Sequence, residues 1–529
     1  MQEPDGALTT LGLAWHVLEP KEEGVELSGQ DECNQFLNAT VDALWHRIRT
    51  SLERTERRAL IEECLRNHEG VQLDRDLWRR TSRALTAVYK DRDDVIAAAH
   101  RREAGFSRAT LSSRVLVEMS VCTCPLGGGS KPGVAEFDEL LAAVARLIAL
   151  AYDSDATRAG LSEPNIRVFP NGEFATSGKF YETVLLPYHS GHFSERFEER
   201  LRSYPELYKA PQRAGLPVEE VFDREFISAF EAEYGLPLQR LVLVGEALEG
   251  RAVSKEKIVD SMTLKDMEHL LVSRAGLVPG QVDAFVRNFC FAPRESWDFA
   301  PIGFVDKDWF PWRFRRRLSL MARPIVRTGL GEHDPLFYAP GLVRDGFANL
   351  VVGSHSGGFD AKYFITARMR TWIGAINNKR GHEFNEEVAE EFRKFNFQAR
   401  ASVQMAEFDV PHEMGDLGDI DVLAWSTSGL VYIVECKNLR FAMTVGEIVD
   451  QLKRFKGEAN ELSKHMRRCL WLSRNPDRLA RVIASYGSPE LKPLMVSNTI
   501  VPMQFVRDLP MPPGDILPIG AISSRIPRA

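Results

Sequence analysis

Asp421, Glu435 and Lys437 have residue types and a spacing that could support metal-assisted hydrolysis. One residue separates Glu435 from Lys437, so in a β-strand both side chains point to one face and Cys436 points to the other. If the apolar runs on either side of the turn STSG pair as a hairpin, the strand ends that carry Asp421 and Lys437 lie together. The pattern therefore predicts two carboxylates and an ammonium group at one end of a hairpin.

Such a set can hold a divalent cation. Asp421 and Glu435 supply carboxylates and Cys436 a main-chain carbonyl, which makes a hard, oxygen-rich site suited to Mg²⁺ or Mn²⁺. The cation can polarise a phosphodiester and lower the pKa of a bound water. Lys437 can position or deprotonate that water and neutralise charge in the transition state. Asp419, on the same face as Asp421, is either a second acidic ligand or part of a loop.

The elements that must position these residues follow a regular order. Apolar residues with helical spacing predict a helix before the site, and alternating or continuous apolar runs predict strands. Val431 and Ile433 share the parity of Glu435, so the charged site begins where the apolar run ends. The expected elements are a helix over 381–395, strands over 397–408, 419–425 and 430–437, a long amphipathic helix over 445–466, and later strands near 493–506.

An acidic residue on one strand, followed by Glu-x-Lys at the end of the next, resembles the catalytic motif of the PD-(D/E)XK nucleases, the restriction-endonuclease-like superfamily. Asp421, Glu435 and Lys437 match that motif. The phrase Val-Glu-Cys-Lys is similar to the Mrr-type restriction and Holliday-junction-resolvase branches. The resemblance covers about residues 375–510, and it implies metal-dependent hydrolysis of phosphodiesters by an α/β domain with a central mixed sheet.

These branches also carry a glutamine on the following helix, and Gln451 fits that place. They carry an acidic residue on the preceding helix, where this chain has Asn385 instead. Glu383 and Glu387 lie four residues apart, and therefore on one helix face, so both are candidate substitutes. The sequence leaves open which of the two completes the site.

A second stretch, residues 309–317, mixes aromatic residues with arginines. Arg313, Arg315 and Arg317 share strand parity, and together they can contact the phosphates of a nucleic acid. The alternative is a solvated strand face above an aromatic core. The net charge of −7 excludes a basic chromatin-type protein, but it is compatible with an enzyme that has a local basic face.

The chain has 529 residues, which is enough for several domains. Its patterns predict a multidomain α+β fold with three parts. These are a mainly helical N-terminal domain over 1–165, a mixed α/β middle over 166–350 for sensing or nucleic-acid contact, and the nuclease-like domain over 351–529. The seven cysteines are irregularly spaced and no signal peptide is evident, so we expect reduced thiols and a cytoplasmic protein. No apolar run of about 18 residues predicts a membrane span.

The first hypothesis is a metal-dependent endonuclease that uses Mg²⁺ or Mn²⁺ and acts on double-stranded DNA. A role as a restriction or anti-phage defence effector rests on analogy alone. Two alternatives stay open: a catalytically silent nucleic-acid-binding or assembly module, and a nuclease for RNA or branched DNA. The complete set of Asp421, Glu435 and Lys437 argues against the silent module. A homo-oligomer and a defence-system partner protein both stay open as assemblies.

Overall fold

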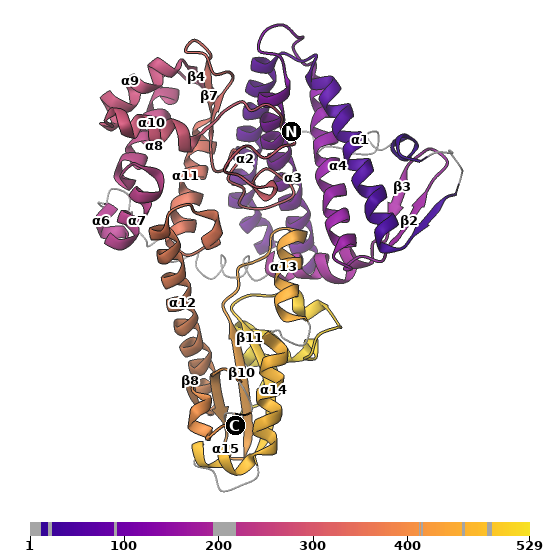
Figure 1. Cartoon of the computed structure of the whole chain (residues 1–529), viewed down its shortest axis with the longest axis vertical. Helices are drawn as coiled ribbons and strands as arrows, with labels where there is room; N and C mark the ends of the chain where they lie inside the picture. Colours follow the sequence, from indigo (N-terminus) through magenta and orange to yellow (C-terminus); the bar gives the residue numbers. More distant parts are fainter. Residues whose placement is uncertain are drawn as a thin grey trace. The chain divides into compact units, whose positions relative to one another are not determined.

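The computed structural model describes residues 12–18, 24–88, 92–193, 218–411, 413, 416–456, 461–483 and 489–528. The chain divides into two compact units. The first holds Met1–Ser177 and Leu201–Gly374, and the second holds Gly178–Arg200 and Ala375–Ala529 (Figure 1). The predicted α+β class is confirmed, with helices in the N-terminal region and a mixed sheet in the C-terminal part. The domain boundaries expected at 165 and 350 remain predictions.

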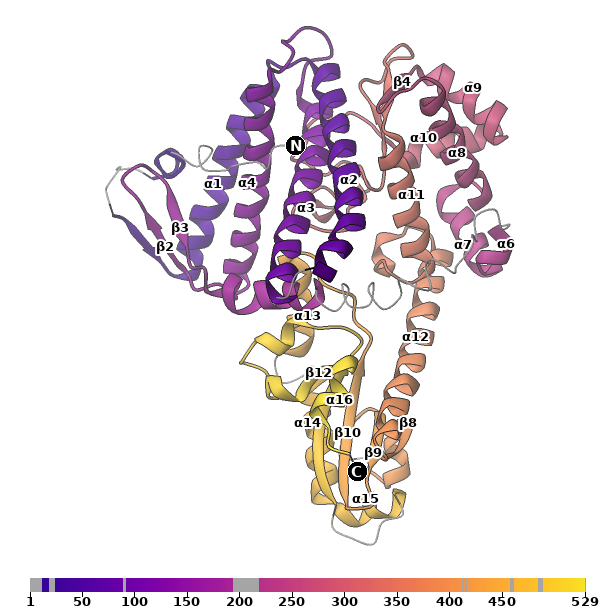
Figure 2. The ribbon, with the colours of Figure 1, turned by 180° about the vertical axis from the view of Figure 1, so that it is seen from behind.

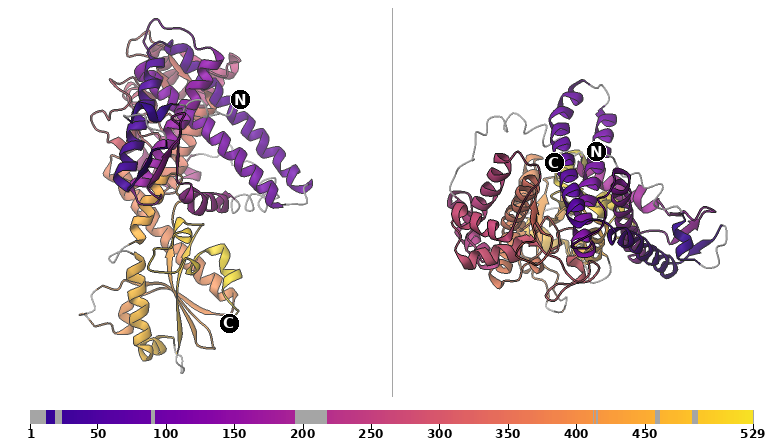
Figure 3. Two further views of the ribbon diagram at one scale, coloured as in Figure 1. Left: turned by 90° about the vertical axis from the view of Figure 1, so that its right-hand side faces the viewer. Right: turned by 90° about the horizontal axis from the view of Figure 1, so that it is seen from above.

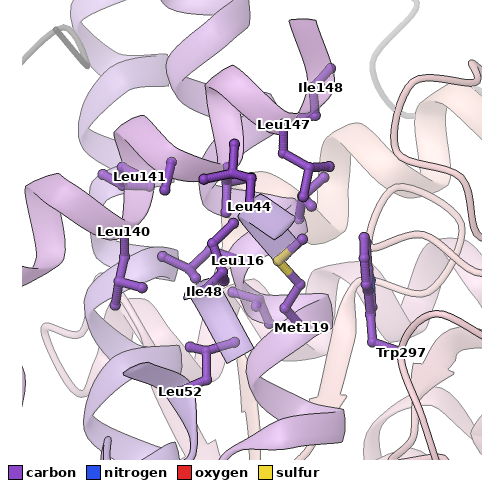
Figure 4. Packing of buried hydrophobic residues seen from close by; sticks show 14 of the residues in the cluster. Leu44, Ile48, Leu52, Leu116, Met119, Leu140, Leu141, Leu147, Ile148 and Trp297 are labelled. Carbon is purple, nitrogen blue, oxygen red and sulfur yellow. The ribbon is translucent and has the colours of Figure 1, made fainter. Parts of the chain in front are cut away.

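Four long helices build the main core of the first unit. Leu37, Leu44 and Ile48 are buried along one face of the first helix, as the sequence predicts. Side chains of the first, third and fourth helices interdigitate in the interior, beside Trp297 (Figure 4). The helices are α1 (Gln30–Leu52), α2 (Arg57–Val88), α3 (Arg92–Thr123) and α4 (Val134–Arg158).

Shorter elements complete the first unit. One small sheet has the order β1–β2–β3 and another has the order β4–β7–β6–β5. The strands are β1 (Glu26–Ser28), β2 (Asn165–Val168), β3 (Phe174–Thr176), β4 (Asp260–Met262), β5 (Cys290–Phe291), β6 (Ile325–Arg327) and β7 (Leu336–Tyr338). The further α-helices are α6 (Val218–Val221), α7 (Arg224–Tyr234), α8 (Leu238–Ser254), α9 (Leu264–Ala275), α10 (Pro279–Phe289) and α11 (Pro340–His355). The 3₁₀ helices are η1 (Leu13–His16), η3 (Asp306–Asp308) and η4 (Ala361–Tyr363).

The strand expected over residues 309–317 is wrong. The stretch is a run of turns and bends after η3. Pro311 cannot donate a hydrogen bond to a strand ladder, and Arg315 has a φ of 57°, which lies in the left-handed region. Strand parity therefore does not place Arg313, Arg315 and Arg317 on a common face.

The second unit is built on a five-stranded mixed sheet with the order β12–β11–β10–β9–β8. The pairs β8–β9 and β9–β10 are antiparallel, whereas β10–β11 and β11–β12 are parallel. Figure 2 shows β8, β9 and β10 in adjacent positions. The strands are β8 (Gln398–Val403), β9 (Ile420–Trp425), β10 (Leu430–Lys437), β11 (Glu490–Ser497) and β12 (Ile516–Pro518).

Helices cover both faces of this sheet (Figure 3). Val434 and Cys436 of β10 pack on the side of α12, and Val431 and Ile433 pack on the side of α14. This alternation is the one that the sequence predicts, and it puts Glu435 on the α14 face. The helices are α12 (Ala367–Lys394), α13 (Val445–Phe455), α14 (Glu461–Arg474), α15 (Pro476–Val482) and α16 (Ile522–Arg525).

Two helices replace the single long helix expected over 445–466. α13 ends at Phe455 because Lys456 has an extended backbone, with φ −96° and ψ 146°. Gly457 follows, and glycine is a poor helix former; residues 457–460 lie outside the described part. The strand expected over 397–408 ends at Val403, before η5 (Met405–Phe408). The late strands are confirmed only in part, because η7 (Pro502–Phe505) interrupts them, and η8 (Pro513–Asp515) and η9 (Ile519–Ala521) flank β12.

A helical segment from the middle of the sequence, residues 178–193, belongs to the second unit. It contains the π-helical turn η2 (Tyr181–Leu185). The ring of Tyr188 stacks on Phe441 at 4.6 Å, and its hydroxyl accepts a hydrogen bond from Ala442 N–H at 2.7 Å. His192 stacks on Phe441 at 3.6 Å. The segment therefore supports the loop that follows Lys437, which the sequence does not predict.

All seven cysteines are free, and most are buried. Burial raises the pKa of the Cys124 and Cys290 thiols to about 12. These two thiols therefore stay protonated at neutral pH, as in structural rather than reactive cysteines. Among the helices described, none is long and apolar enough to cross a membrane.

Candidate active site

The pairing of β9 with β10 stops just before the predicted site. The last paired residues are Val434 and Val422, and the same register places Glu435 opposite Asp421. Beyond the paired residues, the Asp421 side chain contacts the β10 main chain: its Oδ2 accepts a hydrogen bond from Cys436 N–H at 2.8 Å. The strand ends that carry Asp421, Glu435 and Lys437 therefore lie together.

Lys437 lies between two carboxylates. Its Nζ is 2.8 Å from Glu435 Oε1 and 2.7 Å from Glu461 Oε2. Burial by itself would lower the pKa of Lys437, but the two carboxylates outweigh burial and raise that pKa above its ordinary value. The ammonium group is therefore held in its charged form, which suits it to positioning and charge neutralisation rather than to accepting a proton.

One face of α14 presents Glu461, His465 and Arg468 to the site. Arg468 Nη1 donates to Glu435 Oε2 at 3.1 Å, and its Nε donates to the Leu417 carbonyl at 2.9 Å. His465 Nδ1 is 3.6 Å from the same Glu435 oxygen, and burial lowers the pKa of His465 to about 4, so the ring is neutral. Sequence reasoning missed all three residues.

The signal that could have found them is their spacing on the helix. Glu461, His465, Arg468 and the buried Leu472 step by four, three and four, which is the spacing of a core-facing stripe. Polar residues in such a stripe are unusual, because burying them costs free energy unless they find partners. A histidine and an arginine at core positions therefore indicate a buried polar site.

Asp421 and Glu435 are carboxylates in different electrostatic surroundings. Burial and the charge of Glu435 raise the pKa of Asp421 to about 6. Burial would also raise the pKa of Glu435, but Lys437 and Arg468 outweigh it and hold that pKa below its ordinary value. The surrounding cations therefore compensate Glu435 more fully than Asp421, and the two carboxylates repel each other.

Asn385 of α12 contacts the site. Its Nδ2 donates to Asp421 Oδ1 at 3.4 Å and lies 3.5 Å from Ser402 Oγ. Asn385 is buried next to Phe384, whereas Glu383 and Glu387 are exposed. Among the described residues no hydrogen bond or ion pair joins either glutamate to Asp421 or Glu435, so the part of Glu383 or Glu387 in the site stays a prediction.

Gln451 and Asp419 shape the neighbouring loops. Gln451 Nε2 donates to the Arg440 carbonyl at 2.6 Å, and within the described residues its buried Oε1 has no partner. Among those residues no hydrogen bond joins Gln451 to Asp421 or Glu435, so its catalytic role stays a prediction. Asp419 Oδ1 accepts a hydrogen bond from Met405 N–H at 3.4 Å. That contact holds the chain between η5 and β9.

The arginines predicted to contact nucleic acid have partners inside the first unit. The partners are Asp155 Oδ2 at 3.1 Å for Arg313 Nη2, Asp308 Oδ1 at 2.9 Å for Arg317 Nε, and the ring of Phe314 at 5.0 Å for the guanidinium of Arg315. Arg316 turns inward, with Nη1 2.7 Å from Glu118 Oε2. The stretch therefore contributes ion pairs to the fold and does not form the row of arginines that strand parity predicts.

The donor set at the strand ends fits a Mg²⁺ or Mn²⁺ ion. Protein sites for Mg²⁺ often supply one or two carboxylates and leave the other positions to water and phosphate. Asp421 and Glu435 supply two, and a cation would offset the burial and the repulsion from Glu435 that raise the pKa of Asp421. Within the described part of the chain, no three His, Cys, Asp or Glu side chains are gathered for a metal ion. Binding would thus rest on these two carboxylates and on oxygens such as the Cys436 carbonyl.

A family model described as "Anti-phage protein Upx-like" matches residues 1–510. The chain belongs to the Upx-like family of anti-phage proteins. The match includes residues of both compact units, the strands that carry Asp421 and Glu435 among them. No curated protein and no solved structure matches the chain. Membership of the Upx-like family supports the defence role and does not specify a chemical activity.

Proposed function

We propose that this Upx-like protein is a metal-dependent endonuclease that hydrolyses phosphodiester bonds in DNA, and that this activity carries its anti-phage role. The observation that carries the proposal is the convergence of Asp421, Glu435 and Lys437 at one end of β9 and β10. The same residue types on the same elements support the resemblance to PD-(D/E)XK nucleases.

Each residue has its own part in the proposed reaction. A Mg²⁺ or Mn²⁺ ion held by Asp421 and Glu435 would supply charge stabilisation and an activated water. Lys437 presents a fixed positive charge where negative charge develops on the phosphate. Arg468 and Lys437 hold the two oxygens of Glu435 in one orientation. Asn385 donates to Asp421 and orients that carboxylate.

A plasmid-nicking assay with the full chain tests the proposal, with Mg²⁺ and with EDTA. Asp421→Asn is the decisive variant, because its amide oxygen can still accept the Cys436 N–H while the metal-binding charge is lost. We expect cleavage to fall by at least about 10²-fold. Thermal unfolding in EDTA should be unchanged or occur at higher temperature, because the removed charge is one that burial and Glu435 disfavour.

Glu390→Gln is the matched control, since Glu390 is an exposed carboxylate on α12 that pairs with Arg393 and is not a candidate for the site. It should cleave at the wild-type rate. Cleavage by Asp421→Asn at that rate would contradict the proposal. RNA and a four-way DNA junction serve as further substrates. If the protein cleaves one of these and not the plasmid, that nucleic acid is its substrate. Binding without cleavage of any substrate would indicate the silent module.

A further inference from the structure

A cavity of about 360 Å³ lies in the first unit, and none of the residues proposed for catalysis lines it. It is lined by residues of α9 and α10 and by residues in and next to β5 and β6; Figure 1 shows where these helices lie. Three arginines face this cavity: Arg287, Arg323 and Arg327. Its volume is in the range of about 300–1,000 Å³ that is typical for small-ligand sites.

No acidic side chain neutralises these arginines. Across the described ranges, no ion pair joins a carboxylate to Arg287, Arg323 or Arg327, although Glu268 and Asp283 also line the cavity. Burial lowers the pKa of Arg323, and the groups that oppose this effect, such as Tyr363 and Cys290, include no carboxylate. By contrast, the buried Arg316 of the same unit has Glu118 as its partner. The lining therefore carries three guanidinium groups against two carboxylates, and an anion would neutralise the excess positive charge.

Main-chain carbonyls hold Arg323 in place. Its Nη1 donates to the Arg287 carbonyl at 2.7 Å and its Nε donates to the Arg317 carbonyl at 3.2 Å. Arg327 Nη2 donates to the Leu330 carbonyl at 3.4 Å. These bonds fix the two guanidinium groups and leave further N–H donors for a ligand, so little side-chain entropy is lost when an anion binds.

The other lining residues narrow the class of ligand. Guanidinium groups match phosphate oxygens in geometry and charge, and three of them suit a group with more than one negative charge. Glu268 and Asp283 can accept hydrogen bonds from hydroxyl or amino groups, and Leu264 and Val286 offer apolar contact. We propose that this cavity binds a mononucleotide, with its phosphate on the three arginines and its sugar and base against the other residues.

Calorimetric titration of the full chain tests the proposal, with AMP, ATP, adenosine and inorganic phosphate as probes. EDTA is present so that no probe binds through a metal ion at Asp421. We expect AMP or ATP to bind and adenosine to bind at least about tenfold more weakly, because adenosine has no phosphate to meet the arginines. The result does not depend on the nuclease proposal.

Arg287→Ala is the variant that leaves the fold intact, because the Arg287 side chain is exposed and no hydrogen bond or ion pair of it is found among the described residues. It should weaken AMP or ATP binding at least about tenfold, whereas Arg274→Ala, which changes an exposed arginine of α9 outside the cavity, should not.

The proposal is overturned if no phosphate-bearing probe binds, or if the Arg287→Ala and Arg327→Ala variants both bind AMP and ATP as tightly as wild type. If inorganic phosphate binds as tightly as AMP, the cavity is a general anion site and the mononucleotide proposal is wrong. If a 5′-phosphorylated oligonucleotide binds more tightly than AMP, the ligand is the phosphorylated end of a nucleic-acid strand and not a mononucleotide.

Discussion

The ammonium group of Lys437 contacts Glu435 and Glu461, so its removal changes charge at the site and leaves the proposed metal ligands in place. Lys437→Ala should lower single-turnover cleavage by about 10²-fold or more. Binding of Ca²⁺, an inert substitute for Mg²⁺, should be unchanged or tighter, because a like charge has gone. Lys379→Ala, an exposed lysine of α12, is the control. A loss of Ca²⁺ affinity as large as that of Asp421→Asn would give Lys437 a structural role instead.

Arg468 is a buried cation with two partners, Glu435 and the Leu417 carbonyl. Arg468→Ala leaves the buried Glu435 carboxylate short of a partner, so we expect the free energy of unfolding to fall by about 3–5 kcal/mol. Arg467→Ala changes an exposed neighbour on α14 and should stay within about 0.5 kcal/mol of wild type. Urea unfolding of both variants measures the difference. Equal midpoints would show that the ion pair contributes nothing.

The sequence predicts some residues of the site much better than others. Strand alternation has a period of two, so the common face of Glu435 and Lys437 follows from local spacing alone, and the short turn brings Asp421 to them. Glu461, His465, Arg468 and Asn385 come from helices on the two faces of the sheet. Local spacing shows that Glu461, His465 and Arg468 share a buried stripe, but which turn of a helix faces a strand end depends on tertiary packing.

At the scale of elements, a buried ion pair joins α3 to the loop after η3. Glu118 is fully buried and accepts from Arg316 Nη1 at 2.7 Å and Nη2 at 3.1 Å. Glu118→Ala should lower the free energy of unfolding by about 3–5 kcal/mol, because Arg316 would stay buried without its counter-charge. The exposed pair of Glu139 with Arg47 provides the control, and Glu139→Ala should cost less than about 1 kcal/mol. Similar losses for both variants would show that the buried pair stabilises the fold no more than the exposed pair does.

The same ion pair explains why one element was predicted wrongly. Alternating aromatic residues and arginines over 309–317 favour a strand, but Arg316 turns inward to Glu118, which lies 198 residues away in the sequence. Helices whose buried stripe packs on nearby helices, such as α1, follow their local pattern. The break after Phe455 was missed because the polar residues that follow it fit a helix pattern as well as a loop.

At the scale of the whole molecule, the two units are not continuous in the sequence. Residues 178–193 follow β3 of the first unit directly, yet they pack on the loop after Lys437 in the second. Sequence reasoning placed these residues in a middle domain, because nothing in their local pattern records the stacking of Tyr188 and His192 on Phe441. We therefore expect the second unit to need a segment that a cut at residue 375 would leave behind.

This need can be measured with excised chains. Residues 375–529 alone should unfold at lower urea than the same residues fused through a flexible linker to 178–193, because Phe441 loses its stacking partners and Ala442 N–H its acceptor. Tyr188 is fully buried and Tyr181 is 58% exposed, so the two provide a matched pair. Tyr188→Ala in the fused segment should remove about 3–5 kcal/mol of the gain, while Tyr181→Ala should keep nearly all of it. Equal unfolding midpoints with and without the segment would show that the second unit is complete without it. The packing of residues 178–193 on the second unit would then add nothing to its stability.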